Sequence, residues 1–219
     1  MTTVELGKPA DNALPFHVER AKAIQAYASV ELALSHLLAI LLGTSFDLAG
    51  LVFFRITSAN SRNAIIESLL EKRYGTTYQA YWHGIPNTPH KRGLFTWIKQ
   101  LDQRRNEIVH WHTVNNIHIE GDTHTSTLTL SRPNAWAFRS EIQSITVEDM
   151  CEFCAKAAFA SRSITMFMLL LNGDLEKIPD AKQTWHDICQ QPCIYPPPDT
   201  HPLSQNYEAH QIPPESSQA

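Results

Sequence analysis

The chain is predicted to be mainly α-helical, a bundle of about five helices with a small inserted antiparallel β-meander and a proline-rich C-terminal tail. Two observations support this fold class. Apolar residues recur at intervals of three, four and seven through most of the first half of the chain, which is the period of amphipathic helices. After His112 the pattern changes to alternation, which is typical of strands. A helical bundle with a local β insertion is therefore expected.

Length and composition indicate one domain of ordinary size. The chain has 219 residues, of which 43% are hydrophobic and 18% charged. A chain of this size and composition can form a hydrophobic core that is stable without disulfide bonds or structural metal ions. Residues 1–14 are polar and are expected to form a flexible arm. The helical domain is expected over 15–175, with the β-meander at about 114–145. The tail is expected over 176–219, where prolines are frequent and glycine is absent.

No targeting or membrane segment is expected. The first 16 residues lack the basic and apolar regions of a secretory signal. The longest apolar runs, Leu37–Leu42 and Met166–Leu171, are too short to cross a bilayer. A cytoplasmic protein is predicted.

The first helix is predicted from about Pro15 to Leu42, because proline suits a first turn and Gly43 is a natural stop. Its apolar stripe is interrupted by Glu31, which places a carboxylate among apolar neighbours. The stripe is Ile24, Tyr27, Ala28, Leu34, Leu38 and Leu41. Glu31 therefore needs a partner, unless it lies at an exposed edge of the stripe or in a local pair on the same helix.

Two further helices follow. Ser45 or Asp47 can cap a second helix that ends at Arg55. This helix is apolar on most sides, so it is expected to be buried centrally or at a subunit contact. A third helix restarts after Thr57–Asn60 and ends at Gly75. The aromatic connector over 76–89 is expected to pack on the bundle or to offer a stacking surface to bases, and packing is favoured.

The next helix, Leu94 to Thr113, carries polar side chains inside its apolar stripe, and Thr88 and Pro89 are expected to open it. The stripe is Leu94, Trp97, Ile98, Leu101, Ile108 and Val109. Arg105 falls where this stripe should continue, and burying an unpaired guanidinium is costly. An anionic partner or ligand is expected next to Arg105.

Alternating residues after this helix predict the β-meander, with a turn at Gly121–Asp122 and a third strand over Phe138–Ile145. The meander follows the polar helix directly and can form one wall of a site there. Thr146 and Asp149 then make a capping-box start for the last helix, which ends at Asn172–Gly173.

Four cysteines form two close pairs, Cys151/Cys154 and Cys189/Cys193. Paired thiolates are typical of tetrahedral zinc sites. The first pair, however, lies inside a helical apolar run, where buried thiols are common and unreactive. Core packing is therefore favoured over zinc, and neither a metal nor another cofactor is expected.

The stretch from Gln103 to His112 resembles the signature of HEPN domains. Arg105 is followed by Asn106, and His110 comes after three more residues. HEPN domains are all-α domains in which an Arg, a polar residue and a His close one helix, and many are metal-independent ribonucleases. The resemblance covers residues 16 to about 172, and outside the motif it is one of architecture.

The resemblance implies an endoribonuclease in which the ribose 2′-hydroxyl attacks the adjacent phosphate. His110 would transfer protons, because an unperturbed histidine has a pKa of about 6.5. Arg105 would hold the phosphate and Asn106 would orient His110 or the phosphate. HEPN-like proteins often carry an acidic residue on an early helix close to the Arg, which implies that Glu31 fixes Arg105.

Helix geometry separates two of these residues. Arg105 and His110 diverge by about 140° around an ideal helix, so they can serve one phosphate only at the helix edge or across a dimer. The family's composite cleft implies a homodimer here. Arg104, Trp111 and His112 are further substrate-binding candidates, with Trp111 placed for base stacking.

The charge distribution and the motif are compatible with two functions, a ribonuclease and a non-catalytic binding module. The net charge of −4 argues against a protein that coats nucleic acid. Residues 90–112 nevertheless hold five basic and two acidic residues, a local charge of +3, which predicts a small positive cleft for short RNA. Alternatively, the motif is a satisfied polar cluster in a non-catalytic HEPN-like module that binds a protein or nucleic-acid partner. A toxin or defence role, with an antitoxin or other inhibitor protein as partner, stays open.

Overall fold

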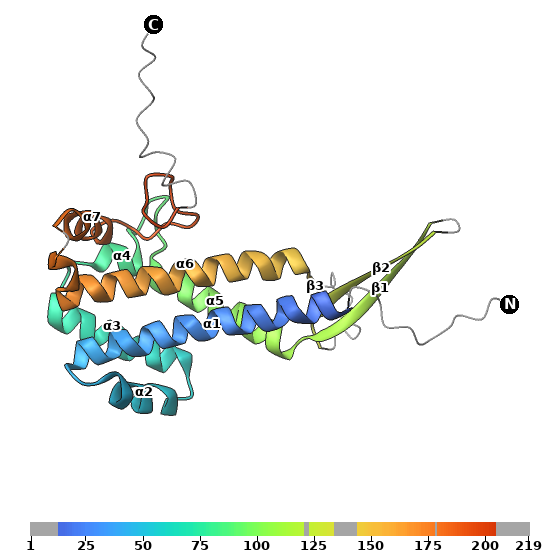
Figure 1. Ribbon diagram of the computed structural model, residues 1–219, viewed down its shortest axis with the longest axis horizontal. Coiled ribbons are helices and arrows are strands. Elements are labelled where there is room, and N and C mark those ends of the chain that lie inside the picture. Colours follow the sequence, from blue (N-terminus) through green and yellow to red (C-terminus); the bar gives the residue numbers. More distant parts are fainter. Residues whose placement is uncertain (1–12, 121–122, 134–143, 178, 205–219) are drawn as a thin grey trace, which may run out of the picture.

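The computed structural model describes residues 13–120, 123–133, 144–177 and 179–204. This part of the chain is mainly helical, with seven α-helices and one three-stranded antiparallel sheet (Figure 1). The prediction of a mainly helical fold with a small antiparallel sheet is therefore confirmed. The turn predicted at Gly121–Asp122 and most of the N-terminal arm and third strand lie outside the described residues.

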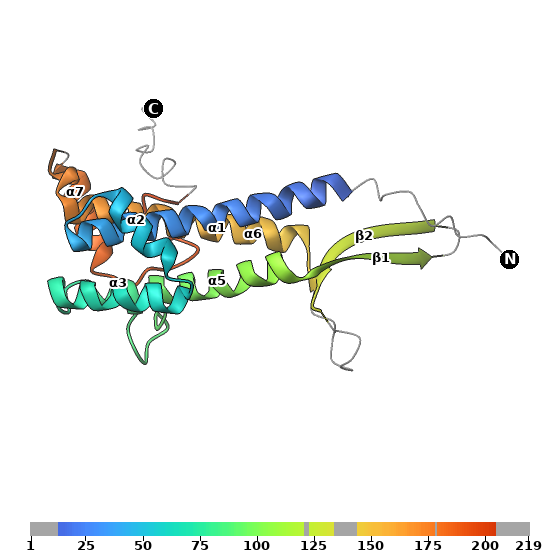
Figure 2. The ribbon, with the colours of Figure 1, turned by 90° about the horizontal axis from the view of Figure 1, so that it is seen from below.

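Two long helices, α1 (Ala13–Leu42) and α6 (Val147–Asn172), form the centre of the bundle and lie side by side (Figures 1 and 2). Each is long and apolar enough to cross a membrane by length and composition alone. The small residues Ala157 and Ala160 of α6 are fully buried, and such residues allow helices to approach closely. In the structure, about half of the most apolar window of α1 and a third of that of α6 are buried within the protein.

The buried face of α1 differs from the predicted stripe. Ile24 and Ala28 are exposed, and the core is reached instead by neighbouring positions. These include Phe16, Ala23, Tyr27, Val30, Leu34, Leu37, Leu38 and Leu41. Glu31 therefore lies at the edge of the buried face, with its side chain 21% exposed. The predicted end is confirmed, because Gly43 takes the positive φ of +66° that favours glycine.

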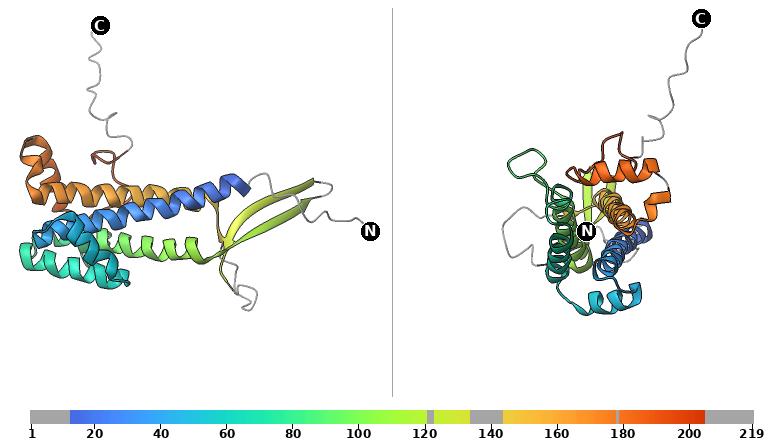
Figure 3. Two further views of the ribbon diagram at one scale, coloured as in Figure 1. Left: turned by 60° about the horizontal axis from the view of Figure 1, so that its bottom comes forward. Right: turned by 90° about the vertical axis from the view of Figure 1, so that its left-hand side faces the viewer.

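Helix α2 (Phe46–Arg55) begins at Ser45, one of its two predicted caps. Helix α3 (Ala59–Tyr74) is capped by Ser58, within the predicted restart at Thr57–Asn60, and ends at Gly75 as predicted. Helix α2 lies on the outer side of α1 (Figure 3). It buries only Ala49 and Phe53. Its other large apolar side chains, Phe46, Leu48, Leu51, Val52 and Phe54, are 48–63% exposed. The prediction of central burial is wrong for a single chain.

The aromatic connector packs on the bundle, as favoured by the sequence. It contains the short helix α4 (Gln79–His83), whose Tyr81 and Trp82 are buried. Gly84 and Gly93 cross closely there, since a Cβ on Gly93 would lie 2.4 Å from backbone atoms of the α4 end. Only glycine fits such a contact.

Helix α5 (Leu94–His110) begins and ends differently from the prediction. Its N-cap is Gly93, so Thr88 and Pro89 belong to the preceding turn. It ends at His110 because Trp111 is already extended, with φ −79° and ψ 149°. The chain then continues directly into the sheet. Helix α5 runs antiparallel to α1 and α6 and contacts both (Figure 2).

The sheet has the order β1–β2–β3, with β1 (His112–Glu120), β2 (Thr123–Ser131) and β3 (Ser144–Ile145). The antiparallel pairing of β1 with β2 confirms the meander. The β1–β2 hairpin projects away from the helices (Figure 1). Leu130 and Ile145 pair with each other and are buried at its base, whereas Ile117 is 60% exposed. The hairpin is an arm rather than a layer of the bundle.

The C-terminal segment departs most from its prediction. The capping box of Thr146 and Asp149 is confirmed, with both hydrogen bonds formed. However, α6 is followed by a 3₁₀ turn (Asp174–Lys177) and by α7 (Pro179–Cys189). Trp185 and Cys189 are buried, one turn apart, on the inner face of α7. The tail predicted from residue 176 is therefore wrong as far as the described residues extend.

The cysteines correct another prediction. Cys151 is exposed and Cys154 half-buried, so the first pair is not a core pair, whereas Cys189 and Cys193 are buried. Burial raises the pKa of the Cys193 thiol to about 12, which keeps it protonated and unreactive. Across the described residues, no group of three His, Cys, Asp or Glu side chains is arranged to hold a metal ion.

The His201 imidazole makes the stability of the fold depend on pH. It packs edge-on against Trp185 with ring centroids 5.6 Å apart, and its Nδ1 accepts a hydrogen bond from the Leu203 amide. Burial lowers the pKa of His201, so the unfolded chain takes up this proton first, near pH 6.5. The free energy of unfolding is expected to fall as pH drops below about 6.5, until the folded imidazole is protonated as well.

Urea unfolding of His201→Phe at several pH values between about 5 and 7.5 checks this prediction. The variant should show a shallower decline at low pH than the natural chain, while His90→Phe, at an exposed position, should keep the natural slope. Equal slopes in all three proteins would contradict it.

Candidate functional site

The end of α5, from which the motif side chains project, is held in place by Arg20 of α1. The Arg20 guanidinium donates to the carbonyl oxygens of Ile108 and Val109, each at 2.9 Å, and to that of Trp111 at 3.1 Å. These last carbonyls of a helix have no partner inside the helix, and they favour a cation. Arg20 therefore fixes the position of His110 relative to α1. No pattern in the sequence pointed to Arg20.

Arg105 lies against α1 and has an acidic partner, as the sequence required, but the partner is Asp102. Its Nη2 is 3.0 Å from Asp102 Oδ1, and its guanidinium carbon lies 4.9 Å from the centre of the Tyr27 ring. The Tyr27 hydroxyl donates to the same carboxylate oxygen at 3.0 Å. Burial, together with the adjacent Asp102 carboxylate, raises the pKa of Tyr27, which keeps the phenol a donor. Among the described residues, the buried Arg105 Nε has no hydrogen-bond partner.

Glu31 does not bind Arg105, which corrects the role that the family resemblance implied. Its carboxylate is paired with Arg62 of α3 at 2.6 Å, and the Arg62 side chain is only 9% exposed. The Arg62 guanidinium also lies 4.8 Å from the centre of the Phe53 ring. Glu31 thus joins α1 to α2 and α3, while Arg105 lies one turn earlier along α1, at Tyr27.

Asn106 and His110 are both exposed. They are four residues apart on α5, which places them about 40° apart around the helix. Within the described part of the chain, neither side chain has a hydrogen-bond partner. Asn106 borders an open hollow of about 510 Å³, together with Asn60, Lys99, Asp102, Gln103, Glu107 and Trp111. No described strand residue lines this hollow, so the meander does not wall it as predicted.

One chain does not bring Arg105 and His110 together. Arg105 is turned toward Tyr27 and Asp102, and His110 is exposed at the helix end. No hydrogen bond or ion pair joins these two described residues. The angular separation expected from the sequence is therefore preserved in the structure.

Of the further substrate-binding candidates, Trp111 lines the hollow, and Arg104, the one permanently charged residue among them, has an acidic partner. Arg104 is paired with Glu107 at 3.1 Å, and Lys99 lies 3.8 Å from Glu67. With Arg105 paired to Asp102, three of the five basic side chains behind the predicted positive cleft have acidic partners, and the hollow itself is lined by one cation, Lys99, and two carboxylates, Asp102 and Glu107. Trp111 is only 9% exposed, so it is a wall of the hollow and not an open stacking platform. His112 is exposed at the start of β1.

The exposed groups can perform acid–base chemistry on a bound anion. His110 is a histidine in contact with solvent, the side chain best suited to proton transfer near neutral pH. Arg105 uses one nitrogen on Asp102 and keeps further donors for an oxyanion. Asp102 and Tyr27, which the sequence analysis missed, set the position of that guanidinium. The spacing of three residues from Asp102 to Arg105 was the available signal.

Comparison with known proteins does not identify the chain. No protein-family model, curated protein or solved structure matches it. Function is therefore inferred from the residues of the site.

Proposed function

We propose that the protein is a metal-independent endoribonuclease of the HEPN type. The observation that supports this most is the end of α5, where Asn106 and His110 are exposed next to each other without a hydrogen-bond partner among the described residues, and where Arg105 is anchored by Asp102 on the same helix. In this reaction the ribose 2′-oxygen bonds to phosphorus and the 5′-oxygen leaves. The products are a 2′,3′-cyclic phosphate and a 5′-hydroxyl.

Each motif residue has a distinct role in this proposal. His110 takes the 2′-hydroxyl proton or delivers a proton to the leaving oxygen. Arg105 binds the phosphate and offsets its developing charge, and Asn106 donates its amide to the phosphate or to His110. Asp102 takes over the positioning role that the family resemblance implied for Glu31, because it is the carboxylate that contacts Arg105.

The proposed active form is a symmetric homodimer with a composite site. Arg105 and His110 of one chain are not joined, so a second copy would supply the missing group. The exposed apolar face of α2, defined by Phe46, Leu48, Leu51, Val52 and Phe54, offers a surface for self-association. The turn after α2 leads to Asn60, which borders the hollow with Asn106.

Replacing Leu51, which is 63% exposed on α2, with aspartate is expected to convert the dimer to monomers, because it buries an unpaired charge in the contact. Light scattering at micromolar concentration measures the change. Leu14→Asp is the matched control, since Leu14 is 75% exposed at the far end of α1. A natural chain that is monomeric at this concentration would remove the dimer from the proposal.

Cleavage of single-stranded RNA in the presence of EDTA tests the proposed reaction. Product strands should carry a cyclic phosphate, which resists phosphate removal until it is opened by acid. Cleavage that stops in EDTA would reject the metal-independent mechanism. The test also separates a nuclease from a zinc enzyme at the cysteine pairs.

A second candidate function is a non-catalytic module that binds a protein or nucleic-acid partner. It is favoured by the state of Arg105, which is already paired with Asp102 and stacked on Tyr27, as expected of a structural cluster. Intact RNA in the EDTA assay, with a stable dimer, would support this reading.

The cellular context forms part of the proposal. We place the protein in the cytoplasm, where RNA is available, because the core side chains of α1 and α6 pack against each other. A toxin or defence role, restrained by an antitoxin or inhibitor, would be compatible with a nuclease of this kind.

A further inference from the structure

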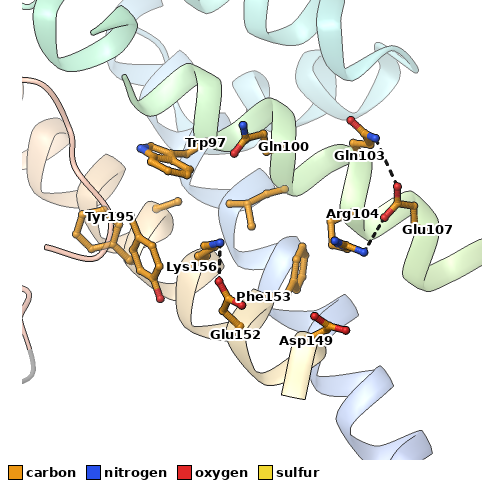
Figure 4. Close-up of a pocket in the computed structure, with 13 residues that line it drawn as sticks. Trp97, Gln100, Gln103, Arg104, Glu107, Asp149, Glu152, Phe153, Lys156 and Tyr195 are labelled. Carbon is orange, nitrogen blue, oxygen red and sulfur yellow. Dashed lines mark hydrogen bonds and ion pairs between the residues drawn. The ribbon is translucent and has the colours of Figure 1, made fainter. Parts of the chain in front are cut away.

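We propose that a cavity between α5 and α6 binds one base of the RNA strand whose phosphate is cleaved at the motif. This inference rests on the proposed function and adds a base-binding subsite to it. The cavity has a volume of about 280 Å³ and lies on the side of α5 that faces α6 (Figure 4). This volume is just below the range typical of small-molecule pockets, which suits a nucleobase rather than a larger ligand.

The cavity is apolar at its floor and aromatic at one end. Leu101, Phe153, Phe159 and Ala160 line it and are each at most 7% exposed. Trp97 and the half-buried Tyr195, which comes from the segment after α7, close the same end (Figure 4). Unpaired bases bind proteins by stacking on such rings.

These two rings are held in position before any ligand arrives. The Trp97 indole nitrogen donates to the Cys193 carbonyl oxygen at 3.0 Å. The Tyr195 ring packs against Phe159 with centroids 5.4 Å apart, and the Lys156 ammonium lies 5.6 Å from its centre. Rings that are already ordered lose little entropy on binding.

The rim favours a neutral base with polar edges over a phosphate. It carries two cations, Arg104 and Lys156, and three carboxylates, Glu107, Asp149 and Glu152, so its net charge is −1. The Arg104–Glu107 and Lys156–Glu152 pairs each join an exposed side chain to a partly buried one, and ion pairs near the surface contribute little to stability. The Gln100 amide has no hydrogen-bond partner in the described structure and can both donate to and accept from a base edge.

The cavity adjoins the motif. Gln103 and Glu107 line both the cavity and the hollow that contains Asn106, and they are hydrogen-bonded to each other at 3.4 Å. From Arg104 to His110 the helix rises about 9 Å at 1.5 Å per residue. A strand can therefore place a base in the cavity and a neighbouring phosphate at the motif. The negative rim helps to keep that phosphate outside the cavity.

The test measures binding separately from cleavage. Fluorescence anisotropy of a labelled single-stranded RNA in EDTA is compared for Tyr195→Ala, Tyr195→Phe and the natural chain. Tyr195→Ala should weaken RNA binding by about 5- to 150-fold, the range for loss of one stacked base, whereas Tyr195→Phe keeps the ring and should bind as the natural chain does. Tyr74→Ala, at another half-buried tyrosine outside the cavity, should leave binding unchanged.

A measurement on the natural chain covers the case in which Tyr195→Ala fails to fold. Addition of adenosine or cytidine should shift the indole N–H signal of Trp97 in a proton–nitrogen NMR spectrum, with the signal assigned through Trp97→Phe. Unchanged RNA binding in a folded Tyr195→Ala, or an indole signal that does not move with any of the four nucleosides, would overturn the subsite.

The two proposals can fail separately. Cleavage in EDTA by a folded Tyr195→Ala with natural RNA affinity would leave the nuclease and remove the subsite. Ring-dependent RNA binding without cleavage would leave the subsite and remove the nuclease.

Discussion

His110→Ala is expected to lower the rate of RNA cleavage in EDTA by about 100-fold or more, the usual loss when a general acid or base is removed. The fold should be unaffected, because the His110 side chain is exposed and, in the described structure, makes no hydrogen bond. Single-turnover cleavage measures the rate, and circular dichroism and light scattering check the fold and the dimer.

The control is His90→Ala, which removes another exposed histidine from the turn before α5 and should cleave at the natural rate. Mixing His110→Ala subunits with Arg105→Ala subunits adds a second readout. A composite site would regain activity in the mixed dimer, because one of its two sites then holds both natural residues. A His110→Ala protein that cleaves as fast as the natural chain would exclude the mechanism.

The helix boundaries could be predicted wherever the stop or start signal is local. Ser45, one of the two predicted caps of α2, and the Thr146–Asp149 capping box each act within four residues of themselves. Ser58, which caps α3, lies within the predicted restart at Thr57–Asn60. Gly43 and Gly75 directly follow the helices that they end, and each has the positive φ that favours glycine. The sequence therefore contained most of the information needed to divide the chain into its long helices.

Partners brought together by tertiary packing could not be predicted in this way. Arg20 caps α5 across 88 or more residues of sequence, and no repeat or spacing marks it. Glu31 was expected to contact Arg105. The buried face of α1 differs from the predicted stripe, so Glu31 pairs with Arg62 of α3, and Tyr27 is the α1 residue that contacts Arg105. The local partner Asp102, three residues from Arg105, was available to the sequence analysis and was overlooked.

The proline content of the C-terminal segment obscured a helix. Prolines predicted an extended tail, yet Trp185 and Cys189 lie one helical turn apart and bury their side chains. Pro192 and Pro196–Pro198 follow α7 and do not interrupt it. The segment after α7 brings Tyr195 to the cavity between α5 and α6, so this error also concealed one wall of the proposed base subsite.

Arg62→Ala is expected to lower the free energy of unfolding by about 2 kcal/mol, between the values for exposed pairs and for fully buried ones. The substitution leaves the Glu31 carboxylate, 21% exposed, without its ion-pair partner. It also removes the guanidinium from the face of Phe53. Urea unfolding measures the loss.

A double-mutant cycle assigns the partner of Glu31. Glu31→Gln and Arg62→Ala should be coupled by about 1 kcal/mol or more, whereas Glu31→Gln and Arg105→Ala should be additive within the usual error of such cycles. The matched control is the Lys22–Glu19 pair, which has the same 2.6 Å separation but a Lys22 side chain that is 61% exposed, and its coupling should be smaller. Stronger coupling of Glu31 to Arg105 than to Arg62 would contradict the packing of α1 against α3 and restore the role that the HEPN resemblance implied for Glu31.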